Sequence, residues 1–475
     1  MSVTERRAGT SPCSADPRWS LRLWGILAVL CLVLFLDGLD ASMVGIALPS
    51  IGRDLGMGPS SLQWIINAYL LGYGGLLLLG GRTADLLGRR RVFLVALAVF
   101  AAASLLGGLT TSGPLLIASR FAKGVAAAFT APTGLSLLTT TFPEGPQRTR
   151  ALSIFSLFGA TGYSSGLVLG GLLTGFGWRL TFLTPVPLAL LALTGGFLLL
   201  PRDRPAKAGG QDPAGALTLT AGMLLTVYAV VSAPVHGWTS ATTLAALVLA
   251  AVLLTAFVLI EKRVRHPLVR FTILRRASTL RANVGILALM GSYTSFQFIM
   301  MLFLQDGRGW SPLRVALALV PVGVVVAVGS PFAGRLVSRF GTTPLTIASM
   351  ISTTAGYTWF LTTAGSSPGY LRTVFPCLIL LGAGFACGYG TIMDQATEGI
   401  DHSEQGLASG LVQTSGQVGA ALVLAVLTAL LSAGGHGSAD FTPYRPGMAL
   451  VVAVAAVGLL FNLLPLLRGR RQRAA

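Results

Sequence analysis

Charged residues are scarce in this chain. Asp, Glu, Lys and Arg together make up 11% of its 475 residues, whereas apolar residues make up 53%. A soluble globular domain normally carries about 25% charged residues, because its surface must be hydrated. The composition therefore excludes a water-soluble protein of this length.

Cysteine and histidine are also rare, with four residues of each. The cysteines show no metal-ligand spacing, and three of them lie in apolar segments, where they act as small hydrophobic residues. The histidines fall in predicted loops, and none is paired with a cysteine or an acid at ligand spacing. A Walker-type phosphate-binding loop is absent as well. These absences argue against a metal site, a bound cofactor, an enzymatic catalytic cluster and ATP binding.

Apolar runs of about 20 residues, each long enough to cross a bilayer as a helix, repeat along the whole chain. Their spacing leaves no room for a soluble domain. We therefore predict an all-α polytopic membrane protein with 14 transmembrane helices. The predicted spans are residues 21–49, 62–80, 92–109, 114–139, 149–172, 178–200, 213–235, 240–260, 279–306, 312–334, 343–364, 371–395, 405–432 and 445–467.

The chain has a net charge of +18, and the distribution of its basic residues fits the predicted topology. If both termini are cytoplasmic, 26 of the 34 Lys and Arg residues lie on the cytoplasmic side, six lie outside, and Arg120 and Lys123 lie within a span. This is the positive-inside distribution of a membrane protein with an even number of spans. We predict a multi-pass protein of the cell (inner) membrane, whose basic residues face the lipid bilayer and not nucleic acid.

A cationic stretch, GRTADLLGRRR, separates the second and third spans. Its two glycines permit a tight turn, and its arginines favour the anionic cytoplasmic leaflet. The pattern resembles the signature loop of the major facilitator superfamily. The resemblance implies that Asp85 docks on a helix N-terminus across the bundle. The alternative is that the whole stretch is a solvated turn whose positive charge keeps it on the cytoplasmic side. The predicted gating loop comprises Gly81, Asp85, Gly88, Arg89 and Arg90.

Two acids, Asp37 and Asp40, lie inside the first apolar span. Each costs about 2.5 kcal/mol or more in a membrane helix, so their shared face must point into the bundle or a wet cavity. The segment DASMVGIALP resembles the first-helix motif of the fourteen-helix drug/proton antiporter family, with Gly45 where that family usually has Asn. One aspartate capping a helix break at Gly38 is the structural alternative.

Two cations, Arg120 and Lys123, lie three residues apart in the fourth span. Arg120 and Gly124 resemble the fourth-helix motif of the same family, in which the arginine is tied to proton coupling; Lys123 stands where Gln is usual. Because two cations on one buried face repel, we expect Asp37 and Asp40 to be their counter-charges. The resemblance thus implies a proton-coupling group of Asp40, Asp37 and Arg120, in which either aspartate could hold the proton.

The fifth span carries four glycines that resemble the motif of the antiporter branches, although Leu167 replaces its proline. Glycines at every fourth residue also describe any close seam between two helices. We therefore predict a packing role for Gly162, Gly166, Gly170 and Gly171.

Polar residues inside other spans are candidates for a substrate cavity. In the thirteenth span, Ser409, Gln413 and Gln417 recur every fourth residue, a pattern that also suits hydrogen bonding between helices. The predicted cavity residues are Asn67, Lys123, Gln297, Asp394, Gln413 and Gln417.

The resemblance continues through the second half, where residues 334–341 form a degraded copy of the signature loop that lacks its acid. Such a copy is expected of two six-helix repeats, and the Pro- and Gly-rich linker after residue 200 suits a hinge between them. The predicted parts are a cytoplasmic tail (1–20), an N-terminal half (21–200), a linker with two extra spans and a basic amphipathic segment (201–278), a C-terminal half (279–467) and a basic tail (468–475).

The resemblance implies a major facilitator fold and a monomeric secondary transporter that exports a toxic amphipathic small molecule, a drug or a secondary metabolite, in exchange for protons. An uptake or facilitative transporter of the same fold is the first alternative. A membrane-embedded enzyme or a receptor is the second.

Overall fold

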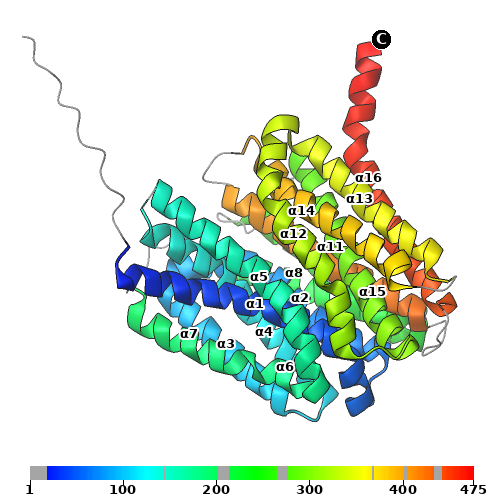
Figure 1. Cartoon of the computed structure of the whole chain (residues 1–475), viewed down its shortest axis with the longest axis horizontal. Coiled ribbons are helices and arrows are strands. Elements are labelled where there is room, and N and C mark those ends of the chain that lie inside the picture. Colours follow the sequence, from blue (N-terminus) through cyan, green and yellow to red (C-terminus); the bar gives the residue numbers. More distant parts are fainter. Residues whose placement is uncertain are drawn as a thin grey trace, which may run out of the picture.

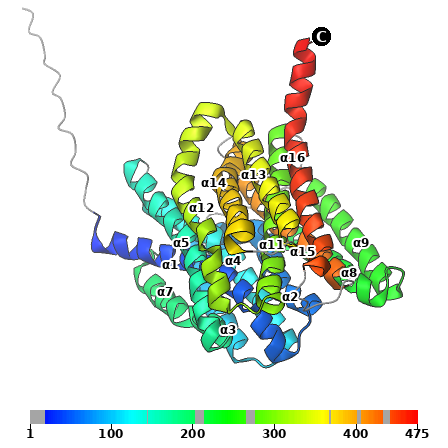
Figure 2. The same ribbon diagram turned by 45° about the vertical axis from the view of Figure 1, so that its right-hand side comes forward.

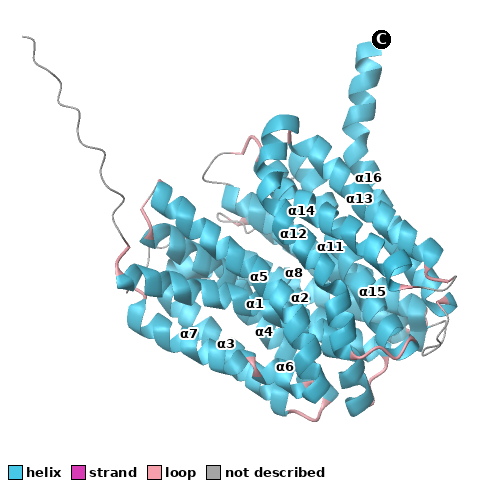
Figure 3. Cartoon of the chain, in the orientation of Figure 1, coloured by secondary structure: helices cyan, strands magenta, loops and turns pink. Residues whose placement is uncertain are grey.

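The computed structural model describes residues 19–143, 145–201, 213–264, 276–365, 369–400, 405–432 and 441–474. Within these residues every regular element is a helix (Figure 3). Each of the 14 predicted spans coincides with one helix or with two consecutive helices, which confirms the all-α fold. Eleven helical segments of this part of the chain are long and apolar enough to cross a membrane.

The first half of the chain contains nine helices among the described residues. They are α1 (Leu21–Leu55), α2 (Pro59–Leu87), α3 (Arg89–Leu109), α4 (Gly113–Thr141), α5 (Pro146–Phe176), α6 (Arg179–Leu183), α7 (Pro185–Leu199), α8 (Pro213–His236) and α9 (Ala241–Arg263). The second half contains α11 (Ala277–Leu302), η1 (Phe303–Gly307), α12 (Pro312–Phe340), α13 (Thr342–Thr363), η2 (Tyr370–Val374), α14 (Phe375–Thr397), α15 (Gln405–Ser432), η3 (Thr442–Tyr444) and α16 (Arg445–Ala474).

The turn between α2 and α3 is much shorter than the sequence predicted. Gly81 and Asp85 lie inside α2, and Gly88 alone separates the two helices, with a φ of 94°. The prediction of a loop from Gly81 to Arg91 is therefore wrong except at Gly88: helix-forming residues continue α2 to Leu87, and Gly88, at a positive φ that favours glycine, ends the helix. Gly341, with a φ of 84°, makes the same one-residue link between α12 and α13.

Two further helices differ from their predicted spans. The span 178–200 is divided at Thr184 into α6 and α7, because Pro185 has no N–H group with which to continue the helical hydrogen bonds. Helix α16 continues past the predicted end of the last span, through the basic tail to Ala474, and projects from the bundle (Figure 1).

The helices form two bundles that lie side by side (Figures 1 and 2). Helices α1 to α7 form one bundle and α11 to α16 form the other, while α2 packs on α15 and α5 packs on α12 across the boundary. Helices α8 and α9 pack on each other and belong to neither bundle. Helix α8 contacts both α2 and α15. Within the first bundle α1 packs on α5, α2 on α4, and α3 on α4.

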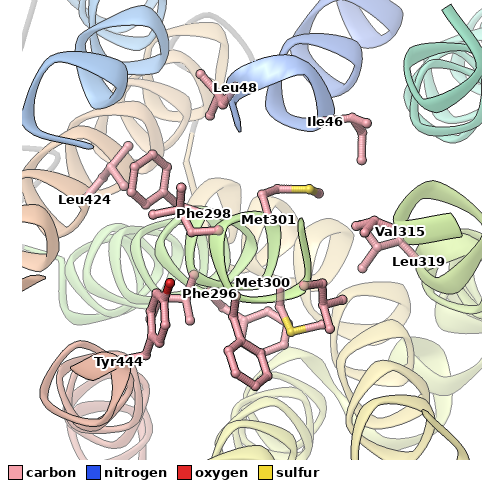
Figure 4. Close-up of a cluster of buried hydrophobic side chains, with 14 of the residues drawn as sticks. Ile46, Leu48, Phe296, Phe298, Met300, Met301, Val315, Leu319, Leu424 and Tyr444 are labelled. Atoms are coloured by element: carbon pink, nitrogen blue, oxygen red, sulfur yellow. The ribbon is translucent and has the colours of Figure 1, made fainter. Parts of the chain in front are cut away.

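Cross-bundle packing is concentrated at one end of the molecule, which we call the Asp54 end. There Ile46 and Leu48 of α1 face Phe298 and Met301 of α11 in a buried apolar cluster (Figure 4). Such burial is worth about 25 cal/mol per Å² of apolar area when that area would otherwise meet water. The two bundles are therefore closed against each other at this end.

Polar contacts reinforce the closure of the Asp54 end. Nε2 of Gln305 donates a hydrogen bond to the Ile46 carbonyl oxygen at 3.0 Å, and Arg53 pairs with Asp306 at 3.7 Å. Asp54 itself accepts hydrogen bonds from Trp178 Nε1 at 2.9 Å and from Arg179 at 2.8 Å, which fixes the end of α1 to α6. At the opposite end, marked by Gly88, α5 and α12 diverge (Figures 1 and 2).

Candidate functional site

A buried ionic cluster joins α1 to α4 within the first bundle. Asp40 accepts a charged hydrogen bond from Arg120 on one carboxylate oxygen and from Lys123 on the other. The side chains of Asp40 and Lys123 are 0% exposed and that of Arg120 is 2% exposed. Of the two aspartates expected to balance these cations, the structure pairs Asp40 with both.

Each cation of the cluster has a second partner. Arg120 Nε donates to the Ile65 carbonyl oxygen at 3.0 Å, and the guanidinium carbon lies 4.5 Å from the centre of the Tyr69 ring. The Lys123 ammonium lies 4.7 Å from the centre of the Phe100 ring. Cation–π contacts of desolvated groups stabilise by about 2 kcal/mol. These partners hold both cations on the side of α4 that faces Asp40.

Glycines allow the helices around the cluster to approach closely. A Cβ atom added to Gly124 would lie 2.2 Å from the Tyr69 carbonyl oxygen, so α2 contacts the backbone of α4 directly beside Lys123. On α5, Cβ atoms at Gly162 and Gly166 would lie 2.4 and 2.5 Å from carbonyl oxygens of α1. The helix that carries Asp40 is therefore held between α4 and a glycine face of α5.

The remaining two predicted packing glycines face different helices. A Cβ atom on Gly170 would lie 2.8 Å from Met43 Cα of α1, whereas one on Gly171 would lie 2.4 Å from Ala316 Cβ of α12. Three of the four glycines thus lie on the α1 seam, and Gly171 lies on the seam between the bundles. Leu167, which replaces the proline of the motif, is buried inside an uninterrupted α5.

Asp37 lies one helical turn from Asp40 in a different environment. It is half-buried, and its carboxylate accepts a long hydrogen bond from the Thr130 hydroxyl at 3.5 Å. With residues of α3, α4 and α5 it lines a narrow void that includes Phe93 and Phe155. The two aspartates, Arg120 and Lys123 together carry no net charge when all four are ionised.

A second group of polar side chains connects α5 of the first bundle to α11 of the second. The Tyr163 hydroxyl of α5 lies 3.1 Å from Gln297 Oε1 and 3.4 Å from the Tyr293 hydroxyl, both on α11. The Tyr293 ring lies 4.5 Å, centre to centre, from that of Phe385. Gln297 was predicted from the sequence; Tyr163 was not, because one tyrosine in an apolar helix gives no signal by itself.

Asn67 of α2 is fully buried, and neither its amide nitrogen nor its amide oxygen has a hydrogen-bond partner among the described residues. An unpaired buried amide is costly, at about 1–3 kcal/mol. One turn earlier, Gln63 accepts a hydrogen bond from Thr428 of α15. Asn67 therefore offers hydrogen-bonding capacity that the protein itself does not use.

The six predicted cavity residues do not form one group. Lys123 is buried inside the first bundle with Asp40, whereas Gln417 lies on the seam between α2 and α15, where a Cβ atom on Gly74 would lie 2.6 Å from it. Gln413 is half-buried, and Asp394 is exposed near the end of α14. Sequence spacing predicts which residues share a helix face, but not which helices meet there.

The predicted gating residues are described in part. The side chain of Asp85 lies outside the described residues, so its docking on another helix stays a prediction. Arg90 donates a hydrogen bond to the Phe197 carbonyl oxygen of α7 at 2.6 Å, and its guanidinium carbon lies 5.3 Å from the centre of the Phe197 ring. Arg90 thus joins the start of α3 to the end of α7. The amphipathic segment expected after residue 264 also lies mostly outside the described residues.

The chemistry available at the ionic cluster is proton binding and charge pairing. Across the described ranges, no three His, Cys, Asp or Glu side chains converge in a way that could hold a metal ion. Together with Asp37, the cluster instead offers two carboxylates whose charges are balanced by Arg120 and Lys123, and a change of protonation state of either acid alters this balance.

Comparison with known sequences identifies the kind of protein that this chain resembles. Residues 30–424 match the model of the Major Facilitator Superfamily. The chain is 38% identical to the puromycin resistance protein pur8 of Streptomyces alboniger, over 87% of this chain and 82% of that protein. It is 36% identical to the cephamycin export protein CmcT of Amycolatopsis lactamdurans, over 93% and 92%, and 31% identical to the lincomycin resistance protein of Streptomyces lincolnensis, over 95% and 94%.

Solved structures with the same arrangement of helices include two transporters. The peptide transporter PepTSo of the POT family matches with a TM-score of 0.67 at 18% identity, over 94% of this chain and 98% of that one. The nucleoside transporter NupG matches with a TM-score of 0.65 at 12% identity, over 93% and 99%. At these identities the likeness shows the fold alone.

Proposed function

The chain belongs to the Major Facilitator Superfamily, and from this premise we propose that it is a proton-coupled exporter of an antibiotic-like, amphipathic small molecule. The substrate class is supported by the relatives named for puromycin resistance, cephamycin export and lincomycin resistance, which align over most of both chains. Membership in a family of transporters sets aside the membrane-enzyme and receptor alternatives.

The observation that carries proton coupling is the buried cluster of Asp40, Arg120 and Lys123, with a second acid, Asp37, one turn away on α1. Ionised groups inside a membrane are costly and are retained chiefly where they serve transport or proton relay. The cluster lies within one bundle and leaves the surface between the bundles to the substrate. The groups proposed to meet the substrate there are Asn67, Tyr163, Gln297 and Gln417.

Helix α1 provides the link between proton binding and the opening of the transporter. It carries Asp37 and Asp40 in its middle, and further along it carries Ile46 and Arg53, which contact the second bundle at the Asp54 end. Because α1 is one continuous helix of 35 residues, a tilt caused by a change of charge in its middle would alter both the cluster and the closed end. Alternating access then follows from rocking of one bundle against the other.

We infer from the positive-inside rule that both termini are cytoplasmic. The Asp54 end then faces the outside of the cell, and the described contacts correspond to a state closed to the outside. One chain provides both bundles and the seam between them, so we propose that the monomer is the transporting unit.

Transport into everted membrane vesicles tests the proposed function. The vesicles are supplied with puromycin, lincomycin or a cephamycin, and a pH gradient with an acidic lumen is imposed in the absence of ATP. We expect uptake of at least one compound against its gradient, abolished when nigericin collapses the pH gradient. Vesicles without the protein provide the baseline.

The same assay distinguishes the remaining alternative. A facilitative transporter would equilibrate the compound with no response to the pH gradient, and a symporter would accumulate it under the opposite gradient. Either result would contradict export by proton exchange.

A further inference from the structure

We propose that Asp37 carries the transported proton, because Lys123 keeps Asp40 ionised as a permanent counter-ion. This inference deepens the proposed function and rests on it. It concerns a choice that the sequence left open, because two acids one turn apart both qualify as the coupling acid.

Both carboxylate oxygens of Asp40 are paired with buried cations. One oxygen accepts from Arg120 and the other accepts from Lys123, and all three side chains are almost completely shielded from solvent. Protonation of Asp40 would remove the countercharge of two buried cations at once, which is strongly unfavourable. Asp40 therefore remains ionised throughout the transport cycle.

Asp37 can exchange a proton without disturbing an ion pair. Its contact with the Thr130 hydroxyl is long, at 3.5 Å, and that hydroxyl can rotate to donate or to accept. The charged groups that act on Asp37 are Asp40 on α1 and Lys123 on α4. Tyr69 and Tyr73 of α2 are also close enough to Asp37 to interact with it electrostatically.

The void beside Asp37 extends toward the Gly88 end of the bundle. Asp37 is its single carboxylic acid, and its α3 and α5 sides are formed by the rings of Phe93 and Phe155. Phe93 lies one turn after the start of α3, close to the cytoplasmic surface in the proposed orientation. In the proposed orientation the void therefore lies on the cytoplasmic side of Asp37.

Charge balance defines the transfer step. With both acids ionised, the four groups sum to zero; with a proton on Asp37, they sum to plus one. When substrate enters from the cytoplasm, the O–H bond of the Asp37 carboxyl group breaks, the bonding electrons stay on the carboxylate, and the proton passes to water on the cytoplasmic side. A proton from outside restores the carboxyl group after the substrate has left.

Variants that remove the charge of Asp37, alone or together with that of Lys123, test this assignment. In Asp37→Asn, Asp40 faces two cations and cannot take over the proton. In the double variant Asp37→Asn/Lys123→Gln, Asp40 faces Arg120 alone, and one acid is again balanced by one cation. The double variant should therefore recover a function that the single variant has lost.

The experiment uses purified full-length protein and protons as the probe. Infrared difference spectra between acid and alkaline pH report the carbonyl stretch of protonated carboxyl groups, and exposed acids cancel when a variant is subtracted from the wild type. We expect Asp37→Asn to lose one carboxyl band and the double variant to regain one. Transport driven by the pH gradient, measured in vesicles, should be lost and regained in parallel.

Three results would overturn the proposal. The first is a carboxyl band and pH-driven transport that both persist in Asp37→Asn. The second is a double variant that regains neither. The third would come from Lys123→Gln alone, which keeps both acids: loss of a nearby cation favours the protonated acid, so its transport profile must shift to higher pH, and an unshifted profile contradicts the role of Lys123 even if Asp37→Asn fails to fold.

Failure of the proposal is distinguishable from failure of the proposed function. If wild-type vesicles show no pH-driven transport, proton-coupled export is wrong, and the infrared spectra still report which carboxyl group binds a proton. If the wild type transports and Asp37→Asn transports equally well, export stands and the assignment to Asp37 falls.

Discussion

Asp40 is the side chain on which the buried cluster depends, because it is the counter-ion of two cations at once. Removal of one partner from a buried ion pair costs more than the pair itself contributes, since the remaining charge stays buried without compensation. The two sides of the cluster are not equivalent in this respect. Loss of Asp40 leaves both cations without a counter-ion, whereas loss of Lys123 leaves Asp40 paired with Arg120.

Asp40→Asn should lower the free energy of unfolding by about 3–5 kcal/mol, the cost of breaking a buried pair from one side. Thermal unfolding of the purified protein in detergent, followed by size-exclusion chromatography, measures the change. Lys123→Gln is the matched control and should cost much less. Equal stability of Asp40→Asn and the wild type would mean that the cluster is hydrated and not buried.

At the scale of helices, the seam between α1 and α5 positions the acids. Its glycines bring the two backbones so close that a Cβ atom on Gly166 would lie 2.5 Å from the Leu39 carbonyl oxygen. No flexible side chain can relieve that contact, so a methyl group there must push α1 away from α5. Gly175 lies on the same helix with nothing within 4 Å of an added Cβ atom.

Gly166→Ala should therefore reduce both thermal stability and transport, while Gly175→Ala leaves both near wild-type values. Alanine is favoured over glycine in a helix by about 1 kcal/mol, so a loss at Gly166 reports the collision and not helix propensity. The two variants are compared by thermal unfolding in detergent and by vesicle uptake. Equal behaviour of the pair would show that α1 and α5 are less tightly packed than the structure indicates.

A second prediction for helices concerns the closed Asp54 end. Gln305→Leu removes the hydrogen bond to the Ile46 carbonyl oxygen, which is worth about 0.5–1.5 kcal/mol. The outward-open population should rise by about 2- to 13-fold, the factor equivalent to that energy. Val44 of α1 is buried in the apolar cluster at this end, so the rate at which an impermeant maleimide labels Val44→Cys from outside, in a cysteine-free background, measures this population.

Ser311→Cys provides the control for that labelling, because Ser311 is exposed at the Asp54 end in the closed state. Its rate should not respond to Gln305→Leu. An unchanged rate at Val44→Cys would remove Gln305 from the contacts that hold the outside closed.

At the scale of the whole molecule, orientation in the membrane determines the direction of transport. The basic residues lie mainly at the end marked by Gly88 and the termini, which predicts a cytoplasmic location for that end. In intact cells, an impermeant maleimide should label Ser311→Cys but should label Ser20→Cys only after permeabilisation. The opposite pattern would invert the proposed topology and with it the direction of export.

The sequence predicted much of this architecture because a bilayer imposes simple rules. Runs of about 20 apolar residues become helices, since backbone groups must pair internally in lipid. The meeting of Asp40 with Arg120 and Lys123 was also predictable, because buried charges require partners. The meeting of Tyr163 with Gln297 was not predictable, since it depends on how α5 and α11 dock and no local pattern encodes it.

Proton exchange for substrate is the central claim, and its most direct measurement is the sign of the pH change that a substrate gradient produces. Purified protein is reconstituted into liposomes that contain pyranine and the compound identified in the vesicle assay, with the membrane potential clamped by potassium and valinomycin. After dilution into medium without the compound, the lumen should become acidic, because each departing molecule is exchanged for entering protons whichever way the protein is oriented. An alkaline shift, or efflux with no change in luminal pH, would contradict proton-coupled export.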